Sequence, residues 1–220
     1  MLDLKERDDY NLQLIFVRHG ESLSNIGLPT PKEFYEEDTP LSDYGRQQAD
    51  MLSCAFESGE IAHIYSSPMT RTIQTVYPTA QKLGMKIELM PDLLEAGSIT
   101  AGCKKDLLEK LFPLAEPCAI EPTQSGGKLC LPAEESEKEK TDRAKRCIEY
   151  FKSLYSSGET ILVATHGTFF SHLLCAALGV IKEDNLFRCQ IDNCGCTVVT
   201  YRGENRQAFL RTANNTNHLK

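Results

Sequence analysis

The residues with the clearest chemical potential form the run Arg18-His19-Gly20, which follows a short apolar segment at residues 12–17. A neutral imidazole nitrogen can attack phosphorus, so His19 is a candidate nucleophile. Arg18 can hold phosphate oxygens with its forked N–H donors, and Gly20 lets the backbone approach a bound anion closely. The run therefore predicts a site for phosphoryl transfer.

Two later segments carry groups that suit the same anion. His166 follows a second apolar segment at residues 160–165, and its imidazole can donate hydrogen bonds to oxygens that become more negative during the transfer. Arg71 lies in the run Ser-Ser-Pro-Met-Thr-Arg-Thr at residues 66–72, early in a predicted helix, where it can reach the same anion. We group Gly167, which follows the second histidine, with the phosphate-binding positions.

The transfer also needs a proton for the leaving oxygen. Glu95 stands among small residues in Leu-Leu-Glu-Ala-Gly at residues 93–97, after a predicted strand and a proline. It can donate that proton if burial raises its pKa. Glutamates beside loops are usually solvated, so Glu21, Glu88 and Glu121 stay open as alternatives.

Apolar segments that alternate with helical spacing must position these groups. Strands are predicted at residues 12–17, 61–66, 86–90, 160–165, 197–201 and 207–211. Helices are predicted at residues 69–83, at residues 169–178, and from the charge run 134–140 through Tyr150. This alternation indicates an α/β fold, a three-layer αβα sandwich with a mostly parallel central sheet and an antiparallel edge from the final hairpin. Ligands belong at the carboxyl ends of such strands, where both histidines lie.

A single domain is expected for residues 1–220, since a chain of this length can bury one core. Between residues 97 and 141 the pattern becomes irregular, with four prolines and a Gly-Gly pair. We interpret this region as a variable insert that forms a cap or loop. Its lysines at 104, 105 and 128 could meet a distal charge of the substrate.

Composition narrows the partners and the compartment. The net charge of −7 and the pI of about 5.3 argue against a nucleic-acid or anionic-membrane surface. No apolar run approaches the ~20 residues of a membrane helix, and the N-terminus lacks a signal-peptide stretch, so a cytoplasmic location is predicted. The nine cysteines are odd in number and are interpreted as reduced thiols. Cys189, Cys194 and Cys196 lack a second pair at zinc-finger spacing, so they are interpreted as structural thiols and no metal site is expected. No cofactor is expected either.

The order and spacing of the motifs are specific when they are taken together. The sequence resembles the phosphoglycerate mutase-like histidine phosphatase superfamily through Arg18-His19-Gly20, the segment from Ser67-Pro68 to Arg71, Glu95 and His166-Gly167. The resemblance extends from residue 12 to the region of residue 218. It implies a phosphoryl acceptor (His19), phosphoryl ligands (Arg18, Arg71 and His166), an auxiliary contact (Asn25), and a general acid that later acts as the base (Glu95).

Two departures favour the phosphatase branch of that superfamily. Position 24 is Ser24 where the mutases usually carry tryptophan, and this chain contains no tryptophan. Residues 95–99 are small and plain where the mutases have a longer aromatic and basic motif. The short tail after the last predicted strand offers no evident lid to exclude water. We therefore predict a metal-independent phosphatase that hydrolyses a small phosphorylated metabolite through a phosphohistidine on His19.

Two other functions stay open. A cofactor-dependent phosphoglycerate mutase would return the phosphoryl group to another hydroxyl. A non-catalytic module would use the pocket only to bind phosphorylated partners, although binding alone needs neither a nucleophile nor a general acid. The edge strand near the C-terminus can pair between subunits, which allows a homodimer.

Overall fold

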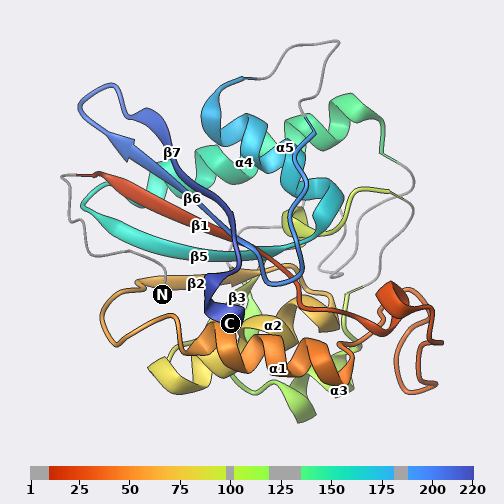
Figure 1. Cartoon of the computed structure of the whole chain (residues 1–220). Helices are drawn as coiled ribbons and strands as arrows, with labels where there is room; N and C mark the ends of the chain where they lie inside the picture. Colours follow the sequence, from red (N-terminus) through yellow and green to blue (C-terminus); the bar gives the residue numbers. More distant parts are fainter. Residues whose placement is uncertain (1–9, 98–101, 119–134, 181–187) are drawn as a thin grey trace.

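The structure, a computed structural model, describes residues 10–97, 102–118, 135–180 and 188–220 (Figure 1). Within these residues a seven-stranded sheet has the order β4-β3-β2-β5-β1-β6-β7. The strands are β1 (Leu12–Arg18), β2 (His63–Ser66), β3 (Ile87–Leu89), β4 (Ala115–Pro117), β5 (Glu159–Thr165), β6 (Cys196–Arg202) and β7 (Gln207–Asn215). Strands β4, β3, β2, β5 and β1 are parallel, β6 is antiparallel to β1, and β7 is antiparallel to β6.

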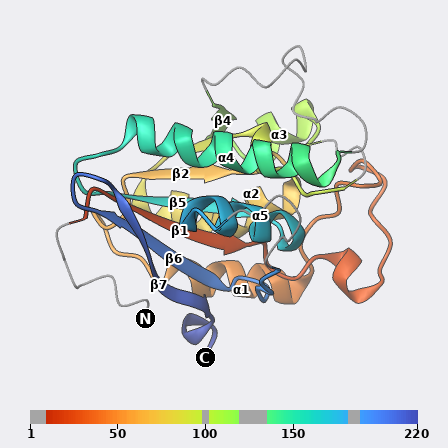
Figure 2. The ribbon, with the colours of Figure 1, turned by 90° about the horizontal axis from the view of Figure 1, so that it is seen from above.

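Helices cover both faces of the sheet, and Figures 1 and 2 show the two helical layers from two directions. One layer contains α1 (Asp43–Ser53), α2 (Thr70–Leu83) and α3 (Lys105–Leu111), and the other contains α4 (Glu137–Leu154) and α5 (Gly167–Leu178). The 3₁₀ helices are η1 (Leu23–Ile26), η2 (Pro91–Leu93) and η3 (Asn217–Leu219). The α/β sandwich with a mostly parallel sheet and an antiparallel edge is thus confirmed.

Alternation along β1 divides the core between the two layers. Leu12, Leu14 and Phe16 belong to the cluster that contains α4 and α5, whereas Ile15 and Val17 belong to the cluster that contains α1 and α2. Side chains alternate between faces along a strand, so a strand that is apolar at nearly every position is buried on both faces. Each fully buried side chain of this kind contributes about 1.5–3 kcal/mol. The strand that ends at the candidate nucleophile is therefore firmly anchored.

Local sequence sets where helices α1, α2 and α5 begin or end. Ser42 Oγ accepts a hydrogen bond of 3.0 Å from the N–H of Gly45 and so caps the start of α1. Gly84 and Gly179 end α2 and α5 in the left-handed conformation, which a glycine adopts without steric cost. Both glycine stops agree with the helix ends predicted from the sequence.

The region predicted as an insert, residues 97–141, contributes two elements that the sequence pattern did not show. Helix α3 packs into the core through Leu108, and β4 pairs in parallel with β3 as an edge strand of the sheet. A strand of three largely exposed residues that ends in proline has no alternating pattern, and proline is tolerated at an edge. The interpretation of this region as cap or loop was therefore wrong for residues 105–111 and 115–117, and residues 112–114 form the turn between them. Residues 98–101 and 119–134 lie outside the described residues.

The opposite edge of the sheet is β7, where Phe209 and Leu210 are exposed. Pairing of this edge in a homodimer stays a prediction. Among the helices of the described residues, none combines the length and the apolar character needed to cross a bilayer.

Candidate active site

The register of two neighbouring strands brings the two histidines together. Arg18 at the end of β1 lies opposite Thr165 at the end of β5, so the residues that follow leave the sheet at the same edge. The ring centroids of His19 and His166 are 5.4 Å apart, and the ring planes are inclined by 61°. Both residues are buried, with exposed fractions of 4% and 0%. The two rings therefore meet in one buried site.

His19 is held in the form that a nucleophile requires. Its Nδ1 lies 2.7 Å from the carbonyl oxygen of Gly20. A carbonyl oxygen only accepts, so Nδ1 carries the hydrogen and Nε2 keeps its lone pair. Burial lowers the pKa of His19 well below its ordinary value, and the positive charges of Arg71 and Arg18 lower it further. The ring is therefore neutral and can attack an electrophile through Nε2.

Arg18 is fixed beside the second histidine motif. Its Nη1 donates a hydrogen bond of 2.8 Å to the carbonyl oxygen of Ile191, and its Nε is buried without a partner in the described part of the chain. A Cβ atom at Gly167 would lie 3.3 Å from that Nε. Gly167 therefore leaves room for the guanidinium at the start of α5, and an unpartnered buried donor is available to an anion.

Arg71 enters the site from the first turn of α2. The residue is almost fully buried, and its Nη1 lies 3.5 Å from the carbonyl oxygen of Glu37. Burial lowers the pKa of Arg71, while the negative charges of Asp38 and Glu95 oppose this shift. Asp38 itself accepts hydrogen bonds of 2.7 and 2.6 Å from the N–H and the hydroxyl of Thr70 and so caps α2. Sequence reasoning missed Asp38, because it lies far along the chain from the helix that it caps.

Asn25 is oriented by a residue from the other end of the chain. Its Oδ1 accepts a hydrogen bond of 3.0 Å from the N–H of Ser22 and one of 3.3 Å from Nδ2 of Asn193. Asn193 also donates a hydrogen bond of 2.9 Å to the carbonyl oxygen of His19. Both bonds to Asn25 use its oxygen, so its Nδ2 group is left as a donor. No motif in the sequence marks Asn193.

Because Gly20 has no side chain, the loop after β1 can lie directly against helix α1. A Cβ atom at Gly20 would lie 2.8 Å from the carbonyl oxygen of Gly45, and one at Gly45 would lie 1.9 Å from the carbonyl oxygen of Glu21. The backbone N–H of Gly20 donates a hydrogen bond of 2.9 Å to Thr75 Oγ1. Gly20 therefore permits a close approach of this loop to α1, and its approach to a bound anion stays a prediction.

Glu95 lies at the start of α5, next to His166. Its Oε1 accepts hydrogen bonds of 2.8 Å from the N–H groups of Ala96 and Phe169, and its Oε2 accepts one of 3.3 Å from the N–H of Thr168. A carboxylate is favoured at a helix N-terminus, where free N–H groups concentrate positive potential. The side chain is half-buried, so the burial that we expected of a proton donor is only partial.

A fully buried arginine supports the segment that carries Glu95. Nη1 of Arg143 donates hydrogen bonds of 2.8 Å to the carbonyl oxygens of Asp92 and Leu94. Its Nε and Nη2 bind the Glu135 carboxylate at 2.8 and 2.6 Å, and its guanidinium lies 3.7 Å from the ring centroid of Phe169. Arg143 thus connects α4 to the segment that precedes Glu95 and to Phe169, whose N–H binds the Glu95 carboxylate. The sequence pattern indicated a solvated helix start here, and it contained no sign that this arginine faces inward.

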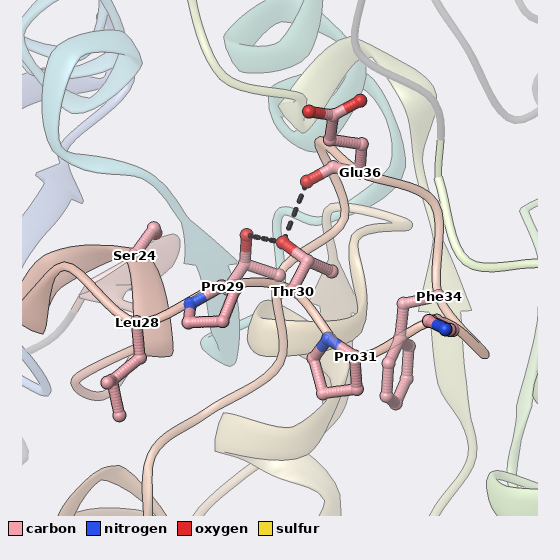
Figure 3. A pocket seen from close by; sticks show the side chains of 9 residues that line it. Ser24, Leu28, Pro29, Thr30, Pro31, Phe34 and Glu36 are labelled. Carbon is pink, nitrogen blue, oxygen red and sulfur yellow. Dashed lines mark hydrogen bonds between the residues drawn. The ribbon is translucent and has the colours of Figure 1, made fainter.

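A pocket of about 500 Å³ lies within the loop between β1 and α1 (Figure 3). An isolated bridge between Ser22 and Leu41 closes the base of this loop, and the Thr30 hydroxyl donates a hydrogen bond of 2.8 Å to the carbonyl oxygen of Glu36 across it. The lining residues combine apolar and charged side chains: Ser24, Leu28, Pro29, Thr30, Pro31, Lys32, Phe34, Glu36 and Thr39. Lys104 binds the same loop through the carbonyl oxygen of Glu33, so it does not extend freely toward a substrate.

The remaining candidates have other contacts. His172 lies near Thr141 and Glu137 on α4, and His63 pairs with Glu88 at 3.2 Å, so neither joins the two facing rings. Glu21 accepts a hydrogen bond of 2.7 Å from the Ser42 hydroxyl. The last alternative glutamate, at position 121, lies outside the described residues, as do the cysteine at position 130 and the lysine at position 128. No group of three or more metal-binding side chains occurs in the described residues.

With this geometry established, comparison with known proteins gives the family. The family described as the histidine phosphatase superfamily (branch 1) matches residues 14–215. The chain belongs to the histidine phosphatase superfamily. This confirms the family to which the four motifs pointed.

Relatives of this histidine phosphatase carry names of two kinds. A probable phosphoglycerate mutase, GpmB of Yersinia enterocolitica, is 28% identical over 214 residues, which cover 94% of this chain and 95% of that protein. The phosphoserine phosphatase of Entamoeba histolytica has a TM-score of 0.65 at 22% identity and covers 95% of this chain and 100% of its own. A mycobacterial glucosyl-3-phosphoglycerate phosphatase has a TM-score of 0.66 at 17% identity, with coverage of 93% and 99%. At these identities the solved structures establish the shared fold.

Proposed function

We propose that this histidine phosphatase hydrolyses phosphomonoesters, in particular a small phosphorylated metabolite, through a phosphohistidine on His19 and without a metal ion. The observation that carries the proposal is the state of His19. Its Nδ1 is occupied by the Gly20 carbonyl oxygen, its ring is kept neutral, and a second imidazole lies 5.4 Å away between ring centroids. A neutral nucleophile beside two guanidinium groups suits attack on a phosphate dianion.

The chemistry would proceed in two displacements. Nε2 of His19 attacks phosphorus, a P–N bond forms, and the P–O bond to the leaving group breaks as the leaving oxygen takes a proton from the Glu95 carboxyl. Water then attacks the phosphohistidine and gives a proton to the Glu95 carboxylate, and the P–N bond breaks to release inorganic phosphate. Arg18 and Arg71 supply positive charge, and these two arginines together with His166 supply hydrogen bonds to the phosphoryl oxygens throughout.

Hydrolysis is favoured over mutase activity by the residues around the site. Ser24 lines the pocket in the loop between β1 and α1, and its hydroxyl lies 2.9 Å from that of Ser22. A small hydroxyl side chain leaves this position open to water, where the mutases usually carry tryptophan. The names of the relatives include both activities, so the acceptor of the phosphoryl group must be identified by experiment.

The first experiment uses p-nitrophenyl phosphate in the presence of a chelator, with rapid quenching to trap acid-labile phosphoprotein. We expect turnover and a phosphoprotein that His19→Ala abolishes. His172→Ala is the matched control, because it removes another buried histidine from the same core, and it should keep the phosphoprotein. Turnover that requires added metal, or that persists in His19→Ala, would contradict the proposal.

A second experiment separates the alternatives. When 3-phosphoglycerate is supplied with a bisphosphoglycerate primer, a phosphatase releases inorganic phosphate and a mutase yields 2-phosphoglycerate. A non-catalytic binding module would retain phosphorylated ligands and form neither product nor phosphoprotein. A screen of phosphorylated metabolites would then rank substrates by kcat/KM.

A further inference from the structure

The second histidine of the site has one ring nitrogen in use and one without a partner. Nε2 of His166 lies 2.8 Å from Oγ of Ser67, and both residues are fully buried. Nδ1 of His166 is also buried, and no group in the described residues bonds to it. A buried polar atom without a partner is rare in folded proteins and calls for an explanation.

The contact follows from the sheet. Strands β2 and β5 are parallel neighbours with Ser66 opposite Ala164, so Ser67 and His166 both leave the sheet at its carboxyl edge. Ser67 is in the Ser-Ser-Pro motif that also leads to Arg71, and the motif alone does not indicate a role for its hydroxyl.

The donors and acceptors around Ser67 favour one direction for this hydrogen bond. The N–H of Met69 points at Ser67 Oγ from 3.4 Å, so this hydroxyl oxygen already faces one donor. Among the described residues, His166 Nε2 is the acceptor within reach of the Ser67 hydroxyl hydrogen. If the hydroxyl donates to Nε2, a neutral imidazole must carry its hydrogen on Nδ1, because the partner of one ring nitrogen decides where the hydrogen lies.

We infer that Ser67 is a positioning residue that holds His166 in the tautomer with its hydrogen on Nδ1. The unpartnered Nδ1–H is then a fixed donor for a phosphoryl oxygen, which can only accept. This assignment rests on the proposed function for the identity of the acceptor. Burial lowers the pKa of His166 well below its ordinary value, and the charge of Arg71 adds to the effect, so the neutral form of the ring is favoured. A neutral ring needs the correct tautomer.

The neighbouring residue Ser66 provides a matched control. Its hydroxyl is equally buried and donates a hydrogen bond of 2.8 Å, but to the carbonyl oxygen of Ser67. Ser66→Ala therefore removes a buried hydroxyl of the same kind one residue away without removing a bond to the imidazole.

The direct test is NMR of protein labelled with ¹⁵N in its five histidines, read through long-range couplings between ring hydrogens and ring nitrogens. The signals of His166 are those absent from His166→Gln. We expect the hydrogen on Nδ1 in the natural protein and in Ser66→Ala, and a shift toward Nε2 in Ser67→Ala. Inorganic phosphate should move the Nδ1–H signal of the natural protein. A hydrogen on Nε2 in the natural protein would overturn the inference.

Activity provides a second readout. Loss of one oriented transition-state donor should lower kcat for p-nitrophenyl phosphate by about 10- to 100-fold in Ser67→Ala. Ser66→Ala should stay within about twofold, and Ser67→Thr, which keeps a hydroxyl, should recover most of the loss. Full activity in Ser67→Ala would also overturn the inference. Absence of phosphatase activity in the natural protein would contradict the proposed function alone, since the tautomer is observed without turnover.

Discussion

Glu95 accepts a hydrogen bond of 2.8 Å from the backbone N–H of Phe169, which joins the expected proton donor to the first turn of α5. The same helix begins one residue after His166. The carboxyl group, the N-terminus of α5 and the second imidazole are therefore one structural unit. A change at any of them is expected to affect the others.

Substitution Glu95→Gln tests the proton donor by the choice of leaving group. Glutamine keeps an oxygen for the N–H groups of α5 but cannot give a proton. We expect kcat/KM for an alkyl phosphomonoester to fall by about 10²- to 10⁴-fold, and that for p-nitrophenyl phosphate to fall much less, because p-nitrophenolate leaves without a proton. Glu21→Gln is the control and should leave the ratio unchanged. Equal losses for both substrates in Glu95→Gln would rule out this role.

Substitution Arg143→Met should destabilise the fold. It leaves the Glu135 carboxylate, whose side chain is 11% exposed, and two carbonyl oxygens without their buried partner. Breaking a buried ion pair on one side costs about 3–5 kcal/mol in the free energy of unfolding. Urea unfolding measures this loss.

Arg146→Met provides the comparison on the same helix. Arg146 is half-exposed and lies 3.5 Å from the largely buried Asp92 carboxylate, so its removal should cost less than the removal of the fully buried Arg143. If the two variants lost similar amounts of unfolding free energy, the burial of Arg143 would not increase its contribution to stability.

Substitution Gly45→Ala separates packing from helix propensity. Alanine in a helix is favoured over glycine by about 0.8–1 kcal/mol, so propensity alone predicts a more stable protein. A Cβ atom at this position would lie 1.9 Å from the carbonyl oxygen of Glu21, so the loop after His19 must move. We expect a net loss of about 1–3 kcal/mol and reduced activity. Asp50→Ala, at an exposed position of α1, should change stability by less than about 0.5 kcal/mol.

Stability should fall with decreasing pH already at pH values above those at which carboxyl groups titrate. Burial lowers the pKa of His19 and of His166 well below the ordinary value of histidine, so the unfolded chain binds protons that the folded chain does not. Stability therefore falls as the pH drops below about 6.5, by up to about 1.4 kcal/mol per pH unit for each such ring. Burial raises the pKa of Asp38, which acts in the opposite direction near the pKa of carboxyl groups.

Urea unfolding at about pH 7 and about pH 5.5 measures this effect in the window where histidine dominates. The difference in the free energy of unfolding between the two pH values should shrink in His166→Gln. A natural protein of equal stability at both values would contradict the depressed pKa values.

The sequence allowed prediction of the layers because each depends on local periodicity. The unbroken apolar run in β1 indicated a strand buried on both faces, and Gly84 and Gly179 marked the ends of their helices. Strand β4 could not be predicted from the sequence, because three residues at a sheet edge bury too little apolar surface to produce a pattern.

By itself, the sequence determined the reactive groups and their place at strand ends: His19 after one apolar run, His166 after another, and Arg71 in the helix that follows a third. Only the tertiary structure decided their pairing. The parallel register of β1 and β5 sets the distance between the rings, and Ser67 reaches His166 across 99 positions of chain. The packing of whole elements likewise brings Arg143 to the carbonyl oxygen of Leu94, and Asn193 to Asn25. Such contacts join residues that are distant along the chain, and no local period encodes them, since they depend on how whole strands and helices pack.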